Sequence, residues 1–256
     1  MSRATTSIAK FTAMEVMHNR MLWLVAGAAL VSIGIGFFGH SLAITESQQI
    51  QATFMSASLR VFAIFIVCLV VINTISRELN DKSLEMILSL AITRSSYFFG
   101  KLTGFNIVIL SIVLIFALSL LLAAPMVKVF VWAVSLYCEL FMVLCFSLLC
   151  VMTIRQVPLA ICVVLGFYFL SRTINAAILM VDSPIVVTNS LSNSFVSTVL
   201  HGIAFVMPDL SNFTQSAWLI YGDIIWSDVG TILLQTAVYS ILLMGACLVD
   251  FYRKSI

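Results

Sequence analysis

The chain has 256 residues, of which 62% are hydrophobic and only 9% are charged, and its mean hydropathy is +1.14. A water-soluble domain carries about 25% charged residues, and one globule of this length cannot hide so much apolar surface, so the composition excludes an ordinary soluble protein and predicts an all-α integral membrane protein. The net charge of +2 is too small to indicate a nucleic-acid-binding protein.

The first twenty residues are too polar to cross a bilayer. In a helix, Ile8, Phe11, Met14 and Met17 fall near one stripe, which predicts an amphipathic helix over residues 1–20 that lies along the membrane surface. A frayed polar tail is the alternative. The apolar run that follows reaches no convincing cleavage site, so we expect a retained span and not a signal peptide.

Six segments have about the twenty apolar residues that are needed to cross a hydrocarbon core of ~30 Å. They are residues 21–38, 57–75, 102–124, 129–154, 157–181 and 229–249. Pro125 marks a tight turn between the third and fourth segments, and Pro158 fits the first turn of the fifth. In the first segment, Ala28, Ser32 and Gly36 form a small-residue face, suited to close packing either within the chain or between subunits.

The distribution of Lys and Arg predicts the orientation. If the N-terminus is cytoplasmic, ten of the thirteen basic residues lie on that side, and both termini are cytoplasmic. The ten are Arg3, Lys10, Arg20, Arg77, Lys82, Arg94, Lys101, Arg155, Arg253 and Lys254.

Residues 182–228 connect the last two segments and contain an apolar piece of about 13 residues, too short to span. We therefore expect re-entrant or interfacial helices on the outer face.

Motifs of hydrolytic and metal sites are absent from the sequence. The three histidines are scattered without H-E-x-x-H, and no serine lies in G-x-S-x-G. The six cysteines fall within apolar runs without a C-x-x-C pair, which predicts buried thiols and neither disulfides nor a metal site.

Charge is concentrated in residues 76–101, between the second and third segments. Asp81 is a plausible N-cap, and Leu84, Ile87 and Leu88 follow on one face of a predicted short amphipathic helix. This helix either shields the edge of the bilayer or fills a groove on a cytoplasmic partner.

The stretch RELNDKSLEMILSLAITRSSYFFGK resembles the cytoplasmic loop of the type-2 (export) ABC transporter permeases. Their pattern is close to an acidic pair, Gly-Thr-Leu-Glu, a Leu-rich turn, Pro, a basic residue and Gly-Lys. The matching residues are Glu78, Leu84, Glu85, Ile87, Leu88, Arg94, Gly100 and Lys101. The sequence departs from the pattern at Lys82, where Gly is usual, and at Ala91, where Pro is common.

The resemblance implies a coupling helix that docks on a separate ATP-binding subunit. It implies two such ATPase subunits in each complex, with ATP and Mg on them, and a second permease copy, identical or related. The expected ATPase contacts in this loop are Glu78, Asp81, Lys82, Leu84, Glu85, Ile87, Leu88 and Arg94. The chain itself has no Walker A motif, because Ser95 precedes Gly100–Lys101 at the first Gly position and Leu102 follows. We therefore expect no enzymatic activity and no cofactor in this chain.

Three charged residues lie inside predicted spans: Arg60 in the second, Glu139 in the fourth and Arg172 in the fifth. Intramembrane charges are candidates for functional residues. For Glu139 and Arg172 three readings remain open: an ion pair between the two, a snorkelling Arg172 with a protonated or cavity-facing Glu139, and direct contact with a substrate. Arg60, near the outer end of its predicted span, is expected to snorkel.

The function that the resemblance implies is ATP-driven export by a permease subunit in the plasma membrane, as in the bacterial inner membrane. Low polarity along the spans favours a lipid-like, amphipathic or polymeric substrate over a small ion. The alternative is a mechanical ABC membrane subunit, which transmits ATPase movements to an outer-face protein without moving a solute. A secondary transporter would predict an internal inverted repeat, and none is evident.

Overall fold

A computed structural model describes residues 3–42, 47–81, 93–154, 156–181, 191–214 and 226–253, and every regular element in these ranges is a helix. The α-helices are α1 (Arg3–Val16), α2 (Leu22–Leu42), α3 (Ser47–Asn80), α5 (Arg94–Leu120), α6 (Met126–Thr153), α7 (Val157–Val181), α8 (Leu191–Val206) and α10 (Trp226–Arg253). A π-helical turn, η1 (Met17–Met21), joins α1 to α2, and a short 3-10 helix, η2 (Asn212–Thr214), follows α8.

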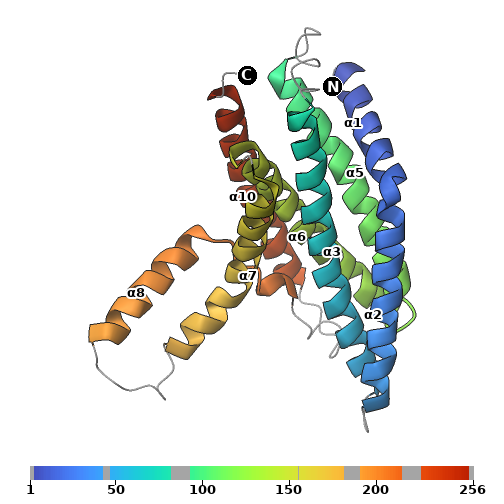
Figure 1. Cartoon of the computed structure of the whole chain (residues 1–256). Coiled ribbons are helices and arrows are strands. Elements are labelled where there is room, and N and C mark those ends of the chain that lie inside the picture. Colours follow the sequence, from blue (N-terminus) through green and yellow to red (C-terminus); the bar gives the residue numbers. More distant parts are fainter. Residues whose placement is uncertain are drawn as a thin grey trace.

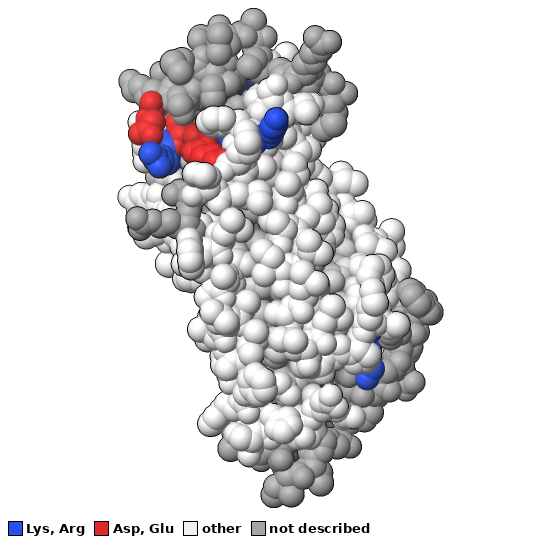
Figure 2. Space-filling model, turned by 90° about the vertical axis from the view of Figure 1, so that its right-hand side faces the viewer, with Lys and Arg blue, Asp and Glu red and all other residues white. Residues whose placement is uncertain are grey.

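Six of these helices, α2, α3, α5, α6, α7 and α10, are long and apolar enough to cross a membrane, the number that the sequence predicts. Both termini lie at the same end of the molecule (Figure 1), which we call the terminal end. On the face drawn in Figure 2, acidic and basic side chains gather at the terminal end, one small basic spot lies toward the opposite end, and the surface between them is uncharged. The chain is a membrane-embedded helical protein.

Proline and threonine set the boundaries between the middle helices. Thr93 caps α5, because its side chain accepts a hydrogen bond from the Ser96 amide at 3.4 Å. Pro125, in extended conformation, is the N-cap of α6, and Pro158 lies in the first turn of α7, where its missing N–H costs nothing.

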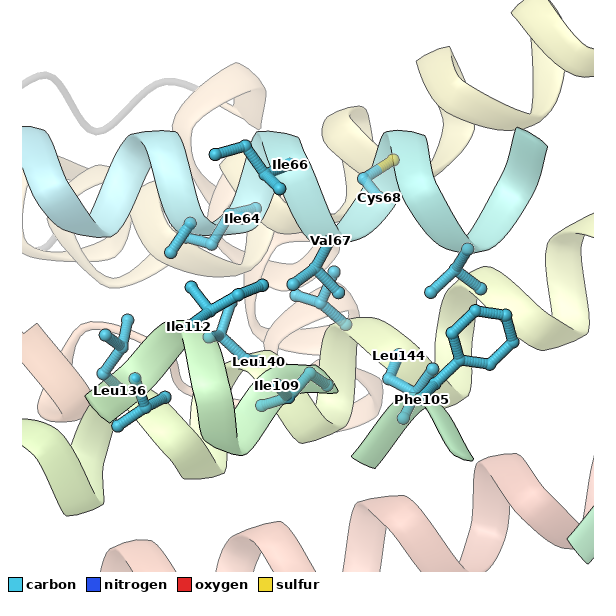
Figure 3. Packing of buried hydrophobic residues seen from close by; sticks show 14 of the residues in the cluster. Ile64, Ile66, Val67, Cys68, Phe105, Ile109, Ile112, Leu136, Leu140 and Leu144 are labelled. Atoms are coloured by element: carbon cyan, nitrogen blue, oxygen red, sulfur yellow. The ribbon is translucent and has the colours of Figure 1, made fainter. Parts of the chain in front are cut away.

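The core is formed by α3, α5 and α6. In Figure 3, Ile64 and Val67 of α3 meet Ile109 and Ile112 of α5 and Leu140 of α6. The α6 helix is buried along most of its length, whereas α2, α7 and α10 expose most of theirs.

The small-residue face of α2 packs within the chain. A Cβ atom on Gly36 would lie 3.4 Å from side-chain atoms of Gln51 and Met55 in α3, and Ser32, one turn earlier, is fully buried. Of the two alternatives for this face, the structure supports packing within the chain.

The arrangement of α1 agrees only in part with the expected amphipathic helix along the membrane surface. Two residues of the apolar stripe are exposed, Phe11 at 63% and Met14 at 54%. Ile8 and Met17 of the same stripe pack partly buried against the core, and Ala9, Thr12 and Ala13 are buried. Thr12 and the Ala9 backbone pack on Gly104 of α5, and Ile8 of the apolar stripe packs on Gly100. The helix therefore runs along α5 and continues into α2 on the same side of the molecule (Figure 1), and it does not turn away across the ends of the spans.

The segment between α7 and α10 returns into the protein. The α8 helix has 16 residues, about 24 Å, which is too short to span, and it runs back beside α7 (Figure 1). The turn after it, residues 207–213, buries Leu210 and Phe213 in the core. This agrees with the re-entrant alternative for the described part of residues 182–228.

All six cysteines are free, and five of them are buried as expected, but Cys162 of α7 is exposed.

Candidate functional site

A cluster of charged and polar side chains lies at the middle of the helix bundle. Its centre is Glu139, which is fully buried, 13 residues after the start of α6 and 14 before its end, so about 20 Å from each. Arg60 of α3, only 3% exposed, forms an ion pair with this carboxylate through Nη1 and Oε2. A buried carboxylate requires such compensation, because neither lipid nor the protein interior solvates charge well.

The ion pair corrects the expectation for Arg60 and excludes one of the three open readings for Glu139 and Arg172. Arg60 does not snorkel to the surface, and Glu139 pairs with Arg60 and not directly with Arg172. Sequence reasoning missed the role of Arg60 because it started the second span at residue 57, whereas α3 begins at Ser47 and places Arg60 13 residues from its start. The polar run SQQIQ extends the helix and brings Arg60 to the depth of Glu139.

Further polar groups complete the hydrogen bonding of the pair. The Tyr168 hydroxyl of α7 donates to Glu139 Oε1 at 2.8 Å, and Arg172 Nη1 donates to the Tyr168 oxygen at 2.7 Å. Arg60 Nη2 donates to the Ser135 hydroxyl at 3.1 Å, and the Arg60 guanidinium also lies 5.6 Å from the centre of the Trp132 ring. The cluster thus joins α3, α6 and α7.

The re-entrant turn docks on this cluster. The Ser135 hydroxyl donates to the Phe213 carbonyl at 2.5 Å, and the Asn175 side chain of α7 donates to the Ser211 hydroxyl at 3.2 Å. Asp209 closes the turn by accepting hydrogen bonds from the Ser211 amide and hydroxyl. The segment that follows α8 is therefore fixed to the same polar centre as the membrane-spanning helices.

A second cluster lies at the terminal end, at the base of the loop of residues 76–101. Glu78, near the end of α3, forms an ion pair with Lys101 of α5 and accepts a 2.6 Å hydrogen bond from the Tyr97 hydroxyl. The Lys101 ammonium and the Glu78 carboxylate are both largely buried. The two ends of the loop are thereby held together, and we call this cluster the loop clamp.

The loop clamp reaches two other helices. Arg94 Nη1 donates to the Phe251 carbonyl in the last turn of α10 at 3.1 Å, and the Tyr97 ring stacks on the Phe251 ring with centroids 6.2 Å apart. The Thr5 and Ser96 hydroxyls are 2.8 Å apart and link α1 to α5. Four helices are connected at the base of the loop.

The predicted contact residues of the loop fall into three groups. Glu78 and Arg94 bind within the chain, and Asp81 is exposed and pairs loosely with Arg77, with 3.7 Å between Nε and Oδ2. Lys82, Leu84, Glu85, Ile87 and Leu88 lie outside the described residues. Sequence reasoning did not predict the structural role of Tyr97, although its position one turn before Lys101 on the same helix face was a usable signal.

No protein-family model and no curated protein matches this chain. Within the part of the chain that the structure describes, no group of His, Cys, Asp and Glu side chains could hold a metal ion.

Proposed function

We propose that this chain is the membrane-spanning permease subunit of a type-2, export-type ABC transporter, driven by separate ATPase subunits. The observation that carries the proposal is the loop clamp: the loop that resembles the coupling loop of that family is fastened at both ends by the Glu78–Lys101 ion pair. The loop base lies at the same end as both termini, which we assign to the cytoplasm.

The clamp favours transmission of force. A force on the loop can separate α3 from α5 only if the largely buried Glu78–Lys101 ion pair breaks. Separating the charges of such a buried pair strongly destabilises a protein. The contacts of Arg94 with Phe251 and of Thr5 with Ser96 tie α10 and α1 to the same base. Movement of the ATPase subunits would therefore reach four helices together.

In this proposal two ATPase subunits bind ATP and Mg, and a second permease copy, identical or related, completes the complex in a bacterial inner membrane. The substrate is a lipid-like, amphipathic or polymeric molecule, because the membrane-spanning helices offer few polar groups.

One observation favours the mechanical alternative. The Phe213 carbonyl and the Ser211 hydroxyl connect the segment after α8 to α6 and α7, so a movement of the core would also move this segment. In that function, the segment passes the movement to a protein on the outer face and no solute crosses. The two functions differ in what stimulates ATP turnover by the complex: a lipid or solute in the first, an outer-face protein in the second.

The test of the shared claim is co-purification with an ATPase. Replacing Leu84 and Ile87 with Asp should abolish co-purification while membrane insertion is kept, because the two carboxylates would occupy the apolar face that the sequence predicts for the coupling helix. The conservative pair Leu84→Met and Ile87→Leu is the control and should retain the ATPase. Normal ATPase binding by the Asp variant would refute the coupling role.

A further inference from the structure

The guanidinium of Arg172 lies deeper in the protein than a snorkelling side chain would. Arg172 is nine residues, about 14 Å, from the end of α7, and a snorkelling side chain would extend toward that end. Its Nη1 instead donates to Tyr168, one turn in the opposite direction. Arg172 is thus directed toward the middle of the bundle.

The charges that are directly connected by hydrogen bonds do not balance. Arg60 and Arg172 carry two positive charges and Glu139 carries one negative charge. Within the described part of the chain, the Tyr168 hydroxyl is the hydrogen-bond partner of Arg172, and no carboxylate lies within ion-pair distance of its guanidinium. A guanidinium has five N–H donors, so most of them remain available to a ligand.

Asp209 lies in the neighbouring re-entrant turn but is engaged there. Its Oδ1 accepts from the Ser211 amide and hydroxyl, and its Oδ2 accepts from the Asn212 side chain at 2.7 Å. This carboxylate closes its own turn and forms no described ion pair with Arg172.

Arg172 can be reached from outside the bundle. It is half-buried, at the boundary between the buried face of α7, which includes Ser171 and Ile174, and the exposed face, which includes Phe169 and Thr173. A molecule that lies along the apolar face of α7 can therefore bring a polar headgroup to the guanidinium.

We propose that Arg172, positioned by Tyr168, is an anion-binding subsite that takes the acidic headgroup of a lipid or lipid-like molecule. A phosphate or carboxylate can accept two parallel hydrogen bonds from a guanidinium and supplies the missing negative charge. The subsite itself is independent of any ATPase. The reading that it selects an acidic amphiphile for export rests on the proposed function.

The test is lipid binding by the purified full-length protein, measured by native mass spectrometry in detergent. Phosphatidylglycerol and phosphatidylcholine with identical acyl chains are the probes. The wild type should bind the anionic lipid about tenfold more tightly, as expected for charge-assisted hydrogen bonds. Arg172→Gln should lose this preference, whereas Lys128→Gln, which removes a positive charge at the start of α6, should keep it.

A second variant keeps the test decisive if Arg172→Gln does not fold. Arg172→Lys retains the charge but cannot form two parallel hydrogen bonds, so binding of phosphatidylglycerol should fall several-fold, and Lys128→Arg should change nothing. If inorganic phosphate competes with the lipid, the subsite also binds free anions. If phosphate does not compete, the subsite is specific for lipid headgroups. Either result supports an anion-binding subsite. No preference in the wild type, or an unchanged preference in both Arg172 variants, would overturn it.

Because this assay contains no ATPase, its failure leaves the proposed coupling function intact. Loss of ATPase co-purification likewise leaves the lipid preference intact, so the two claims fail separately.

Discussion

Removing the negative charge from the Arg60–Glu139 pair leaves two guanidinium groups inside an apolar bundle. Glu139→Gln keeps the size of the side chain and its hydrogen bond with Tyr168, so the variant isolates the effect of charge. We expect the free energy of unfolding to fall by about 3–5 kcal/mol, as for other buried pairs that lose one partner. Unfolding in detergent by denaturant or heat measures this change.

The matched control is Asp81→Asn, which removes the carboxylate of an exposed i,i+4 pair with Arg77. Solvent screens such a pair, so the control should have little effect on unfolding. Equal effects of the two variants would show that the central pair is not compensated as described.

The ion pair of Arg60 could not be predicted from the sequence. An arginine in an apolar run can snorkel or pair, and the choice for Arg60 depends on whether α3 extends back through SQQIQ. The extended start of α3 packs closely on the Gly36 face of α2, a contact between two separate helices. Periodicity within one segment contains no information about it.

Among the helices, the contact of α1 with α5 depends on two glycines. A Cβ atom on Gly104 would lie 2.8 Å from the Thr12 Cβ and 2.9 Å from the Ala9 carbonyl oxygen, so α1 would have to move. We expect Gly104→Ala to lower the free energy of unfolding by about 1–3 kcal/mol. Gly166→Ala in α7 has nothing within 4 Å and should raise it by up to about 1 kcal/mol, because Ala favours helix.

Opposite signs for these two glycine variants in thermal unfolding are the expected result. A gain in stability from both would mean that α1 does not pack on α5 through Gly104.

The re-entrant turn depends on the Ser135 hydroxyl. Ser135→Ala removes the donor to the Phe213 carbonyl and an acceptor for Arg60, so residues 207–213 should exchange their amide hydrogens faster. Ser119→Ala, whose hydroxyl bonds only within its own helix to the Phe116 carbonyl, is the control. Unchanged exchange in the turn would exclude its attachment to the polar centre.

The faces of the helices were harder to predict than their existence. The stripe that contains Phe11 and Met14 was expected to mark the interfacial face of α1, and these two residues are exposed. Ile8 of the same stripe, together with Ala9 and Thr12, instead packs on Gly100 and Gly104 of α5. Small residues contribute little to a hydrophobic pattern, although they permit the closest helix contacts.

For the whole molecule, composition and run length were sufficient to predict six apolar helices, and Pro125 and Pro158 marked two of the boundaries. The short apolar piece between residues 182 and 228 was correctly expected not to span. The central cluster could not be assembled from the sequence, because it joins α3, α6 and α7 with a turn some 150 residues after Arg60 in the chain. Contacts between residues so far apart in the chain depend on how the helices pack against one another.

The central claim is that residues 76–101 contact an ATPase, and site-specific photo-crosslinking in cells tests it most directly. A photoreactive residue at Leu84 should be trapped on an ATP-binding subunit, whereas one at Leu242, on the exposed apolar face of α10, should not. A crosslink from position 84 to a protein with a Walker A motif is the predicted result. The absence of any such crosslink from position 84, with the chain correctly inserted, would contradict the account.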